Sequence, residues 1–326
     1  MFIAGRATRR AILRSLSILL IFSAILCPAQ SMQTTTSPKP EKIIIDTDIG
    51  DDVDDAFAVA LAVRSPELQI LGISTTFGDT ETRAKLLDRL LGETGHPEIP
   101  VAIGDPSHVE SNFTQRQYAK GGHFARPSHP KAVDFILEQI RRYPDDITLV
   151  AIGPLVNIGA LIDKDATAFR KLRRVVLMGG SIERGYGDLG YSKPHGPDAE
   201  WNIKNDIPSA QKLFASDTPI FMLPLDSTQL KLDEVKRAFL FQAGTPITDA
   251  LTLLYHEWGQ QTPTLFDPMT IAFIVDPQLC PVKPMHIIVD EKGFTRPAAG
   301  APNAQVCMHS EPEAFFRFYI PRVSGN

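Results

Sequence analysis

The sequence predicts an α/β fold, an open and mostly parallel sheet with helices on both faces. Short apolar runs alternate with segments of helical periodicity along most of the chain, as in proteins built from β-α-β units. These runs are continuous, which is typical of strands buried on both faces. With 326 residues, 43% of them hydrophobic, the chain is long enough for one large domain, which we expect over residues 42–326.

The first expected strand is KIIID, residues 42–46, where three isoleucines stand between polar residues. Similar runs predict further strands at 68–76, 146–153, 172–180, 218–226 and 285–290. Helical spacing predicts helices at 54–65, 82–95, 132–144, 155–165, 206–216, 246–261 and 267–277. The first helix begins with two aspartates, and acidic residues favour a helix N-terminus.

Three expected strands end in polar or glycine-rich turns: DTDIGDD at 46–52, IGPLVN at 152–157 and MGGS at 178–181. In open parallel sheets, ligands bind outside the carboxyl ends of the strands. We therefore expect the acidic turn to lie next to the other two and to form a binding site with them.

Residues 1–29 resemble an export signal peptide. Four arginines precede an apolar run from Leu16 to Leu26 that is short for a membrane span, and Ala29 stands at a plausible cleavage site. The alternative is an uncleaved anchor; after cleavage we expect no stable membrane insertion. The stretch TRRAILR at 8–14 resembles a twin-arginine signal, with the general secretory route as the alternative. We expect a periplasmic or secreted protein, in which residues 30–41 form a polar linker.

Charge and cysteine content set further limits. Removing residues 1–29 deletes four arginines and no acids, which changes the formal charge from −5 to −9. No basic tract follows residue 15, so nucleic acid is not an expected partner. Cys280 and Cys307 remain, and they are either paired in an oxidising compartment or buried as free thiols.

Six aspartates stand in the ten residues from Asp46 to Asp55. Burying like charges at this density is expensive unless a positive charge lies among them. A solvated loop with a capping aspartate would explain only one or two of them. An EF-hand loop fails because Asp51 and Phe57 stand where glycine and glutamate belong. A phosphatase of the aspartyl-phosphate type is disfavoured by Gly50. A catalytic calcium site fits best, because carboxylates are hard oxygen ligands.

The motifs resemble those of calcium-dependent nucleoside N-ribohydrolases, the inosine-uridine preferring nucleoside hydrolase family. DTDIGDDVDDAFA at 46–58 is similar to that family's Asp-x-Asp-Pro-Gly-x-Asp-Asp-Ala, with a two-residue insertion. In the family's order follow the segments AIGPLVNIGAL at 151–161, VVLMGG at 175–180, DAEWNIKNDIPSA at 198–210 and FDPMTIAFIVDP at 266–277.

The resemblance implies the metal ligands. Ca²⁺ would be held by Asp48, Asp55, Asp267 and the carbonyl of Val156, and Asp48 would also be the catalytic base. An alignment without the two-residue insertion would place Asp52 where the gapped alignment places Asp54. On the gapped alignment Asp51 has no family role, and we expect its charge only to tune the field near the surface.

The resemblance also implies substrate contacts. Asp54 would hold the ribose 2′-hydroxyl, Met178 would line the ribose pocket, and Glu200 and Asn202 would bind ribose hydroxyls. Met178 has a purely structural alternative as a core methionine, and Glu200, Asn202 and Asp267 have one as helix-capping residues.

Three departures affect the part of the site that faces the base. Phe266 replaces the histidine proposed to protonate the leaving base, Asp79 replaces an asparagine, and Pro194 replaces another. The leaving group would then be activated by another residue, by aromatic stacking or by solvent. The candidates are His123, His195, Tyr191 and Trp201.

The resemblance implies hydrolysis of the N-glycosidic bond of ribonucleosides to ribose and free base, with a calcium-bound water. The expected partner is a small-molecule nucleoside, and the family suggests a homodimer or homotetramer. The alternative is an exported nucleoside- or sugar-binding protein that retains calcium but has little catalysis.

Overall fold

The computed structural model describes residues 39–107, 111–121, 123–190 and 192–325. The expected signal peptide and most of the expected linker lie outside these ranges and remain predictions. Within these ranges, no helix is both long and apolar enough to cross a membrane.

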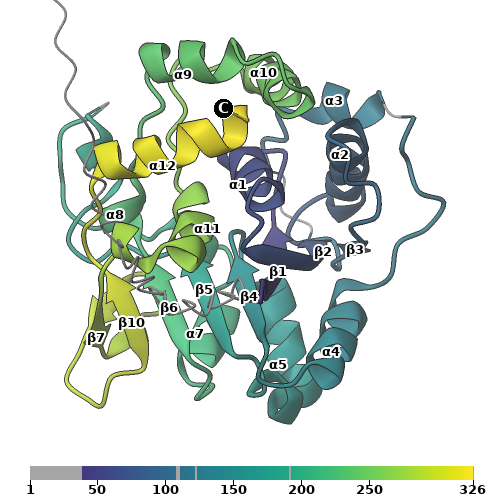
Figure 1. The fold of residues 1–326 in the computed structure, drawn as a ribbon. Helices are drawn as coiled ribbons and strands as arrows, with labels where there is room; N and C mark the ends of the chain where they lie inside the picture. The colour runs from purple at the N-terminus through teal and green to yellow at the C-terminus, as the bar shows by residue number, and fades with distance from the viewer. Residues whose placement is uncertain (1–38, 108–110, 122, 191, 326) are drawn as a thin grey trace, which may run out of the picture. The chain divides into compact units, whose positions relative to one another are not determined.

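An eight-stranded sheet lies at the centre of the described chain and confirms the predicted fold class (Figure 1). Its strand order is β3-β2-β1-β4-β5-β6-β10-β7. The pairs are parallel except that the edge strand β7 runs antiparallel to β10. The strands are β1 (Glu41–Thr47), β2 (Leu68–Thr75), β3 (Val101–Ile103), β4 (Ile147–Ala151), β5 (Arg174–Met178), β6 (Ile220–Leu223), β7 (Val282–Met285) and β10 (Ala304–Cys307).

Helices cover both faces of the sheet (Figure 1). One face carries α1 (Asp54–Val63), α2 (Thr80–Glu93), α10 (Pro246–Trp258), α11 (Pro268–Val275) and α12 (Pro312–Ser324). The other carries α4 (Ala132–Arg142), α5 (Val156–Phe169) and α7 (Ile207–Phe214). The remaining helices of the described residues are α9 (Glu234–Phe241) and the shorter α3 (Arg116–Lys120), α6 (Trp201–Lys204), α8 (Leu225–Thr228), η1 (Tyr186–Leu189) and η2 (Pro277–Leu279).

Strand β1 shows why the apolar runs are continuous. Ile43 and Ile45 pack into the core on one face of the sheet, whereas Ile44 packs into the core on the other. All three side chains are fully buried. Because successive side chains of a strand point to opposite faces, a strand covered on both sides needs apolar residues at every position.

The C-terminal part differs from the expectation. The expected strand at 285–290 is divided between β7, in the large sheet, and β8 (Ile287–Val289), which pairs with β9 (Thr295–Pro297) in a separate hairpin. Cys280 and Cys307 form a disulfide with Cα atoms 5.6 Å apart. The structure thus resolves the question that the sequence left open.

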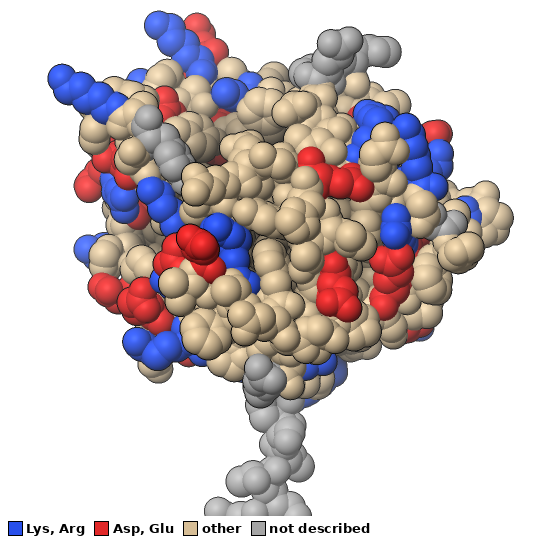
Figure 2. All heavy atoms as spheres, turned by 90° about the horizontal axis from the view of Figure 1, so that it is seen from above, with Lys and Arg blue, Asp and Glu red and all other residues tan. Residues whose placement is uncertain are grey.

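Charged side chains are mixed on the face seen in Figure 2, where Lys and Arg lie among Asp and Glu. This face, as far as the structure describes it, presents no continuous basic surface.

Candidate active site

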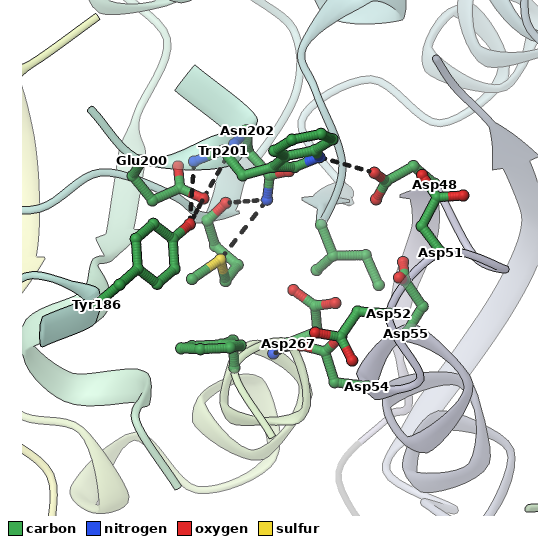
Figure 3. Close-up of a pocket in the computed structure, with 13 residues that line it drawn as sticks. Asp48, Asp51, Asp52, Asp54, Asp55, Tyr186, Glu200, Trp201, Asn202 and Asp267 are labelled. Atoms are coloured by element: carbon green, nitrogen blue, oxygen red, sulfur yellow. Dashed lines mark hydrogen bonds between the residues drawn. The ribbon is translucent and has the colours of Figure 1, made fainter. Parts of the chain in front are cut away.

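A cavity of about 270 Å³ opens at the carboxyl ends of β1, β4 and β5, where the polar turns were expected to meet. Figure 3 shows carboxylates along one side of it and Tyr186, Glu200 and Asn202 along the other. Most of the expected site residues line it: Asp48, Asp52, Asp54, Asp55, Met178, Glu200, Trp201, Asn202 and Asp267. Its other lining residues are Asp51, Ile152, Tyr186 and Phe266.

Local structure positions three of the carboxylates. Asp54 and Asp55 are the first residues of α1, where the helix dipole favours negative charge. Thr47, at the end of β1, donates its hydroxyl hydrogen to Asp55 Oδ1. Asp267 precedes Pro268 at the start of α11, and its backbone N–H donates to Asp54 Oδ2 at 3.3 Å. The starts of two packed helices therefore meet at one point.

Asp54, Asp55 and Asp267 form a carboxylate triad that fits a metal ion. One oxygen from each lies within 4.8 Å of the others, and all three side chains are buried. Burial raises the pKa of each carboxyl well above its ordinary value, and repulsion from neighbouring carboxylates raises it further. A cation among them would relieve this repulsion, and hard oxygen ligands suit Ca²⁺ or Mg²⁺.

Asp48 lies directly after β1 and outside this triad. Its Oδ2 accepts a hydrogen bond from Trp201 Nε1 at 3.3 Å. Burial raises the pKa of the Asp48 carboxyl to about 7, while the positive charge of Arg83 opposes the rise. Gly153 lies so close that a Cβ there would be 2.9 Å from Asp48 Oδ1 and 2.7 Å from its backbone nitrogen. The glycine in the turn after β4 therefore makes room for Asp48.

Asp52 is an exposed residue and lies at the mouth of the cavity. Its Oδ1 accepts a hydrogen bond from the backbone N–H of Val53 at 2.7 Å. Asp54, two residues later, is buried and belongs to the triad. The gapped alignment, in which Asp54 and not Asp52 belongs to the inner site, stays a prediction.

Arg83, on α2, is a buried cation that the sequence analysis did not identify. Its Nη1 and Nη2 each lie 3.0 Å from an oxygen of Asp51, and it also donates to the carbonyl of Asp48. The Arg83 side chain is fully buried and that of Asp51 is 14% exposed. The expectation that Asp51 acts only near the surface is therefore corrected. The sequence did contain one indication of this buried cation. Arg83 stands four positions before Leu87 and therefore lies on the apolar face of the helix.

The segment before α3 also binds the backbone of the acidic loop. No sequence motif indicated this contact. Thr114 donates its hydroxyl hydrogen to the carbonyl of Asp51 at 2.7 Å, and Gln115 Nε2 donates to the carbonyl of Asp52 at 2.7 Å. Gly50 has a φ of 121°, and a Cβ there would lie 2.2 Å from the ring of Phe113. The loop thus needs glycine at this position.

The opposite wall of the cavity is fixed by backbone contacts. Glu200 caps α6, accepting from the backbone N–H of Asn202 at 2.9 Å and of Ile203 at 3.2 Å. It also accepts from Gly180 N–H at 2.9 Å, in the turn after β5. Asn202 Nδ2 donates to the carbonyl of Met178 at 3.1 Å. Glu200 therefore caps α6 and also lines the cavity, whereas Asn202 lies inside α6 and lines the cavity without capping it. Binding of ribose hydroxyls by these two residues stays a prediction.

Tyr186 is a further lining residue that the sequence analysis missed. Its hydroxyl oxygen accepts from the backbone N–H of Trp201 at 3.1 Å. Its ring meets Phe266 edge to face, with centroids 6.2 Å apart. Phe266 therefore has an aromatic partner at the position where a histidine was expected from the family.

Some expected residues lie elsewhere. Val156 begins α5 and is not among the lining residues. Asp79 caps α2 and pairs with Arg116 at 2.9 Å; burial raises the pKa of Asp79, but hydrogen bonds from Thr82 and Arg116 outweigh it, so the pKa is lowered. His123 is exposed and does not line the cavity.

Of the two remaining leaving-group candidates, His195 is not among the lining residues. The side chain of His195 is 52% exposed, and its Nε2 lies 3.8 Å from Asp198. Tyr191 lies outside the described residues. Among the candidates, only Trp201 lines the described cavity.

Comparisons with known proteins agree with this geometry. The family model "Inosine-uridine preferring nucleoside hydrolase" matches residues 43–317. Uridine nucleosidase 1 of Arabidopsis thaliana is 30% identical over 281 residues, covering 78% of this chain and 80% of that protein. The pyrimidine-specific ribonucleoside hydrolase of Citrobacter koseri is 31% identical over 319 residues, covering 86% and 97%.

Solved structures share the fold. A purine-preferring ribonucleoside hydrolase from Gardnerella vaginalis has a TM-score of 0.73 and 27% identity, covering 87% of this chain and 98% of that one. A plant nucleoside hydrolase has a TM-score of 0.77 and 24% identity, covering 88% and 100%. The chain therefore belongs to the inosine-uridine preferring nucleoside hydrolase family and is an enzyme that cleaves the N-glycosidic bond of ribonucleosides.

Proposed function

We propose that this nucleoside hydrolase works with Ca²⁺ and with Asp48 as its general base. The observation that carries the proposal is the buried triad of Asp54, Asp55 and Asp267, which shares one cavity with Asp48. When bound, the cation would neutralise the carboxylates, orient hydroxyl groups and make water easier to deprotonate. The family resemblance adds Asp48 itself and the Val156 carbonyl as further ligands.

Asp48 accepts the proton of the water that attacks the anomeric carbon, and the bond from that carbon to the base breaks. Positive charge develops on the sugar, and the carboxylate-rich wall favours it electrostatically. Asp54 holds the 2′-hydroxyl, as the resemblance implies, while Glu200 and Asn202 hold other ribose hydroxyls from the opposite wall. Met178 lies against the sugar.

The leaving base meets aromatic side chains in place of an imidazole. Among the described lining residues there is no histidine. Tyr186 stands on the side away from Asp48 (Figure 3), and its ring meets that of Phe266 edge to face. Burial raises the pKa of the Tyr186 hydroxyl well above 10, so it is neutral at physiological pH. We infer that stacking and solvent, not a histidine acid, assist departure of the base.

A nucleoside panel tests this proposal. The purified protein is incubated with purine and pyrimidine ribonucleosides, and free ribose is measured after metal removal and after return of Ca²⁺ or Mg²⁺. We expect ribose release that depends on the metal and is restored best by Ca²⁺. The Asp48→Asn variant is the control for the base. Tight nucleoside binding without ribose release would instead support the binding-protein alternative.

We also propose that the protein is exported and cleaved near Ala29, and that it forms a homodimer or homotetramer. The Cys280–Cys307 disulfide supports an oxidising compartment. Changing Arg9 and Arg10 together to Lys should trap the precursor inside the cell if the signal is of the twin-arginine type. Normal export of that variant would favour the general secretory route. Light scattering on the purified protein would decide the oligomeric state.

A further inference from the structure

Trp201 donates a side-chain hydrogen bond to the Asp48 carboxylate. The distance from Trp201 Nε1 to Asp48 Oδ2 is 3.3 Å, and Figure 3 shows the indole N–H directed at this oxygen. Within the described part of the chain, no other side chain donates a hydrogen bond to that carboxylate. Besides the proposed contact with the cation and a backbone hydrogen bond, the position of this indole therefore helps to set the side-chain orientation of the proposed base.

The indole is itself held in place. Trp201 is the first residue of α6, and its backbone N–H is fixed by the hydroxyl oxygen of Tyr186 at 3.1 Å. Phe77 meets its ring edge to face, with centroids 6.1 Å apart and planes at 85°. The Lys204 ammonium lies 5.2 Å from the ring centroid. Contacts to its edge and face restrict rotation of the indole, so its N–H points in one direction.

Phe77 is held in turn by the residue that supports the acidic loop. Its φ is 59°, in the left-handed region that is uncommon for a bulky residue. Arg83 Nε donates to the carbonyl of Phe77 at 2.8 Å, and Arg83 Nη1 donates to the carbonyl of Asp48. The same guanidinium thus fixes the backbone of Asp48 and the residue behind the indole.

We propose that Trp201 is a positioning residue that holds one oxygen of Asp48 so that the other faces the attacking water. This inference rests on the proposed role of Asp48 as general base. A carboxylate on a short side chain can rotate, and a fixed donor selects one orientation. A preorganised base lowers the barrier because no reorientation is needed in the transition state.

This role differs from the leaving-group role considered from the sequence. An indole N–H is a donor only and is not a proton source at neutral pH. It is directed at Asp48 and not at the centre of the cavity (Figure 3). Trp201 therefore acts through Asp48 and not through contact with the base.

A double-mutant cycle tests the inference. Trp201→Phe removes the N–H and keeps an aromatic ring, and it is made both in the wild type and in the Asp48→Asn variant. In the wild type we expect kcat to fall about 10- to 100-fold, the range for a hydrogen bond to a charged group. We expect KM, the Ca²⁺ dissociation constant and Tm to change little. In the Asp48→Asn background, Trp201→Phe should cause no further loss.

The outcomes separate the two proposals. An unchanged kcat in Asp48→Asn alone overturns the proposed function. If Asp48→Asn lowers kcat, but Trp201→Phe leaves kcat unchanged or lowers it equally in both backgrounds, only the positioning role is overturned. A rise in KM without a fall in kcat would make Trp201 a simple substrate contact, which also overturns it.

Fluorescence gives a second measurement that does not require Trp201→Phe to fold. The chain has two tryptophans, Trp201 and Trp258, so Trp258→Phe leaves Trp201 as the only indole emitter. In that background Asp48→Asn replaces a charged acceptor with a neutral one and should shift the emission maximum. Asp52→Asn, at the mouth of the cavity, is the matched control. Equal emission from Trp258→Phe with and without Asp48→Asn would overturn the inference.

Discussion

Arg83 and Asp51 form a buried, bidentate ion pair beneath the active-site loop. The distances from Arg83 Nη1 to Asp51 Oδ1 and from Arg83 Nη2 to Asp51 Oδ2 are both 3.0 Å. The pair supplies a positive charge to the acidic loop from within the protein. It also withdraws Asp51 from the metal site, because both its carboxylate oxygens bind the guanidinium. The triad of Asp54, Asp55 and Asp267 is thus left to a cation from solution.

The first prediction concerns this pair. Asp51→Asn removes the carboxylate that is hydrogen-bonded to the fully buried guanidinium of Arg83, and leaves only the more distant charges of Asp48 and Asp55, so we expect a loss of roughly 3 kcal/mol in unfolding free energy. Urea denaturation of the metal-free protein measures it. The double variant Asp51→Asn/Arg83→Met is the control and should lose less than the sum of the single losses. A loss under about 1 kcal/mol, typical of surface pairs, would contradict the prediction.

The second prediction compares three aspartates of the loop. Asp48→Asn should lower kcat by roughly 10²–10⁴, as expected for loss of a general base. Asp54→Asn should weaken Ca²⁺ binding, because Asp54 belongs to the triad, whereas Asp52→Asn should change both quantities little. Steady-state kinetics and calorimetric titration with Ca²⁺ measure these effects. If Asp52 proves essential and Asp54 nearly silent, the gapped alignment is wrong.

The third prediction concerns metal removal. A ligand that binds only the folded state stabilises it by mass action, by about 2.7 kcal/mol at a hundredfold excess over its dissociation constant. Exhaustive chelation should therefore lower Tm, and added Ca²⁺ should restore it in a concentration-dependent manner. Asp55→Asn should show a smaller Ca²⁺ response. An unchanged melting curve, with no calcium found by elemental analysis, would count against the site.

The fourth prediction concerns pH. Burial raises the pKa of the Asp46 carboxyl from 3.8 to about 6, although hydrogen bonds from Ser74 and Asn157 oppose it. Burial raises that of Asp48 to about 7. In the metal-free protein these groups bind protons more tightly in the folded state. Their stabilising contribution is complete below pH 4 and is lost as pH rises to about 7.

The Tm of the metal-free protein should therefore fall between pH 5 and pH 8. For Asp46 alone the rise in pKa corresponds to roughly 3 kcal/mol. With saturating Ca²⁺, Tm should instead rise with pH, because protons compete with the metal for the carboxylates at low pH. Scanning calorimetry at several pH values measures the dependence of Tm on pH with and without Ca²⁺. The Asp46→Asn variant should show a weaker dependence in the metal-free protein. Groups of lowered pKa, such as Glu67 and Asp146, titrate below this window. A metal-free Tm that increases with pH would refute the assignment.

The central strands were predictable because their signal is local. Ile43, Ile44 and Ile45 are each buried by a helix layer on one side or the other, so the apolar run itself indicates a two-sided sheet. The start of α1 was predictable for the same reason, since Asp54 and Asp55 stand at its first turn. Neither inference needs knowledge of distant residues.

The residues that the sequence did not reveal act across long separations. Arg83 contacts Asp48 and Asp51 from helix α2, and Tyr186 reaches Trp201 from the 3-10 helix η1. Polar residues in loops, such as His123, give no periodicity that distinguishes a cavity wall from an exposed turn. Only the folded chain shows that His123 is exposed and that Tyr186 lines the cavity.

The three carboxylates of the triad become available at very different times during synthesis. Asp54 and Asp55 leave the ribosome early, whereas Asp267 follows 212 residues after Asp55. At about 5–20 residues per second this interval is roughly 10–40 seconds. Throughout it the nascent chain carries the acidic loop without the residue that completes the triad. During synthesis a cation therefore cannot meet the complete triad until α11 has been made.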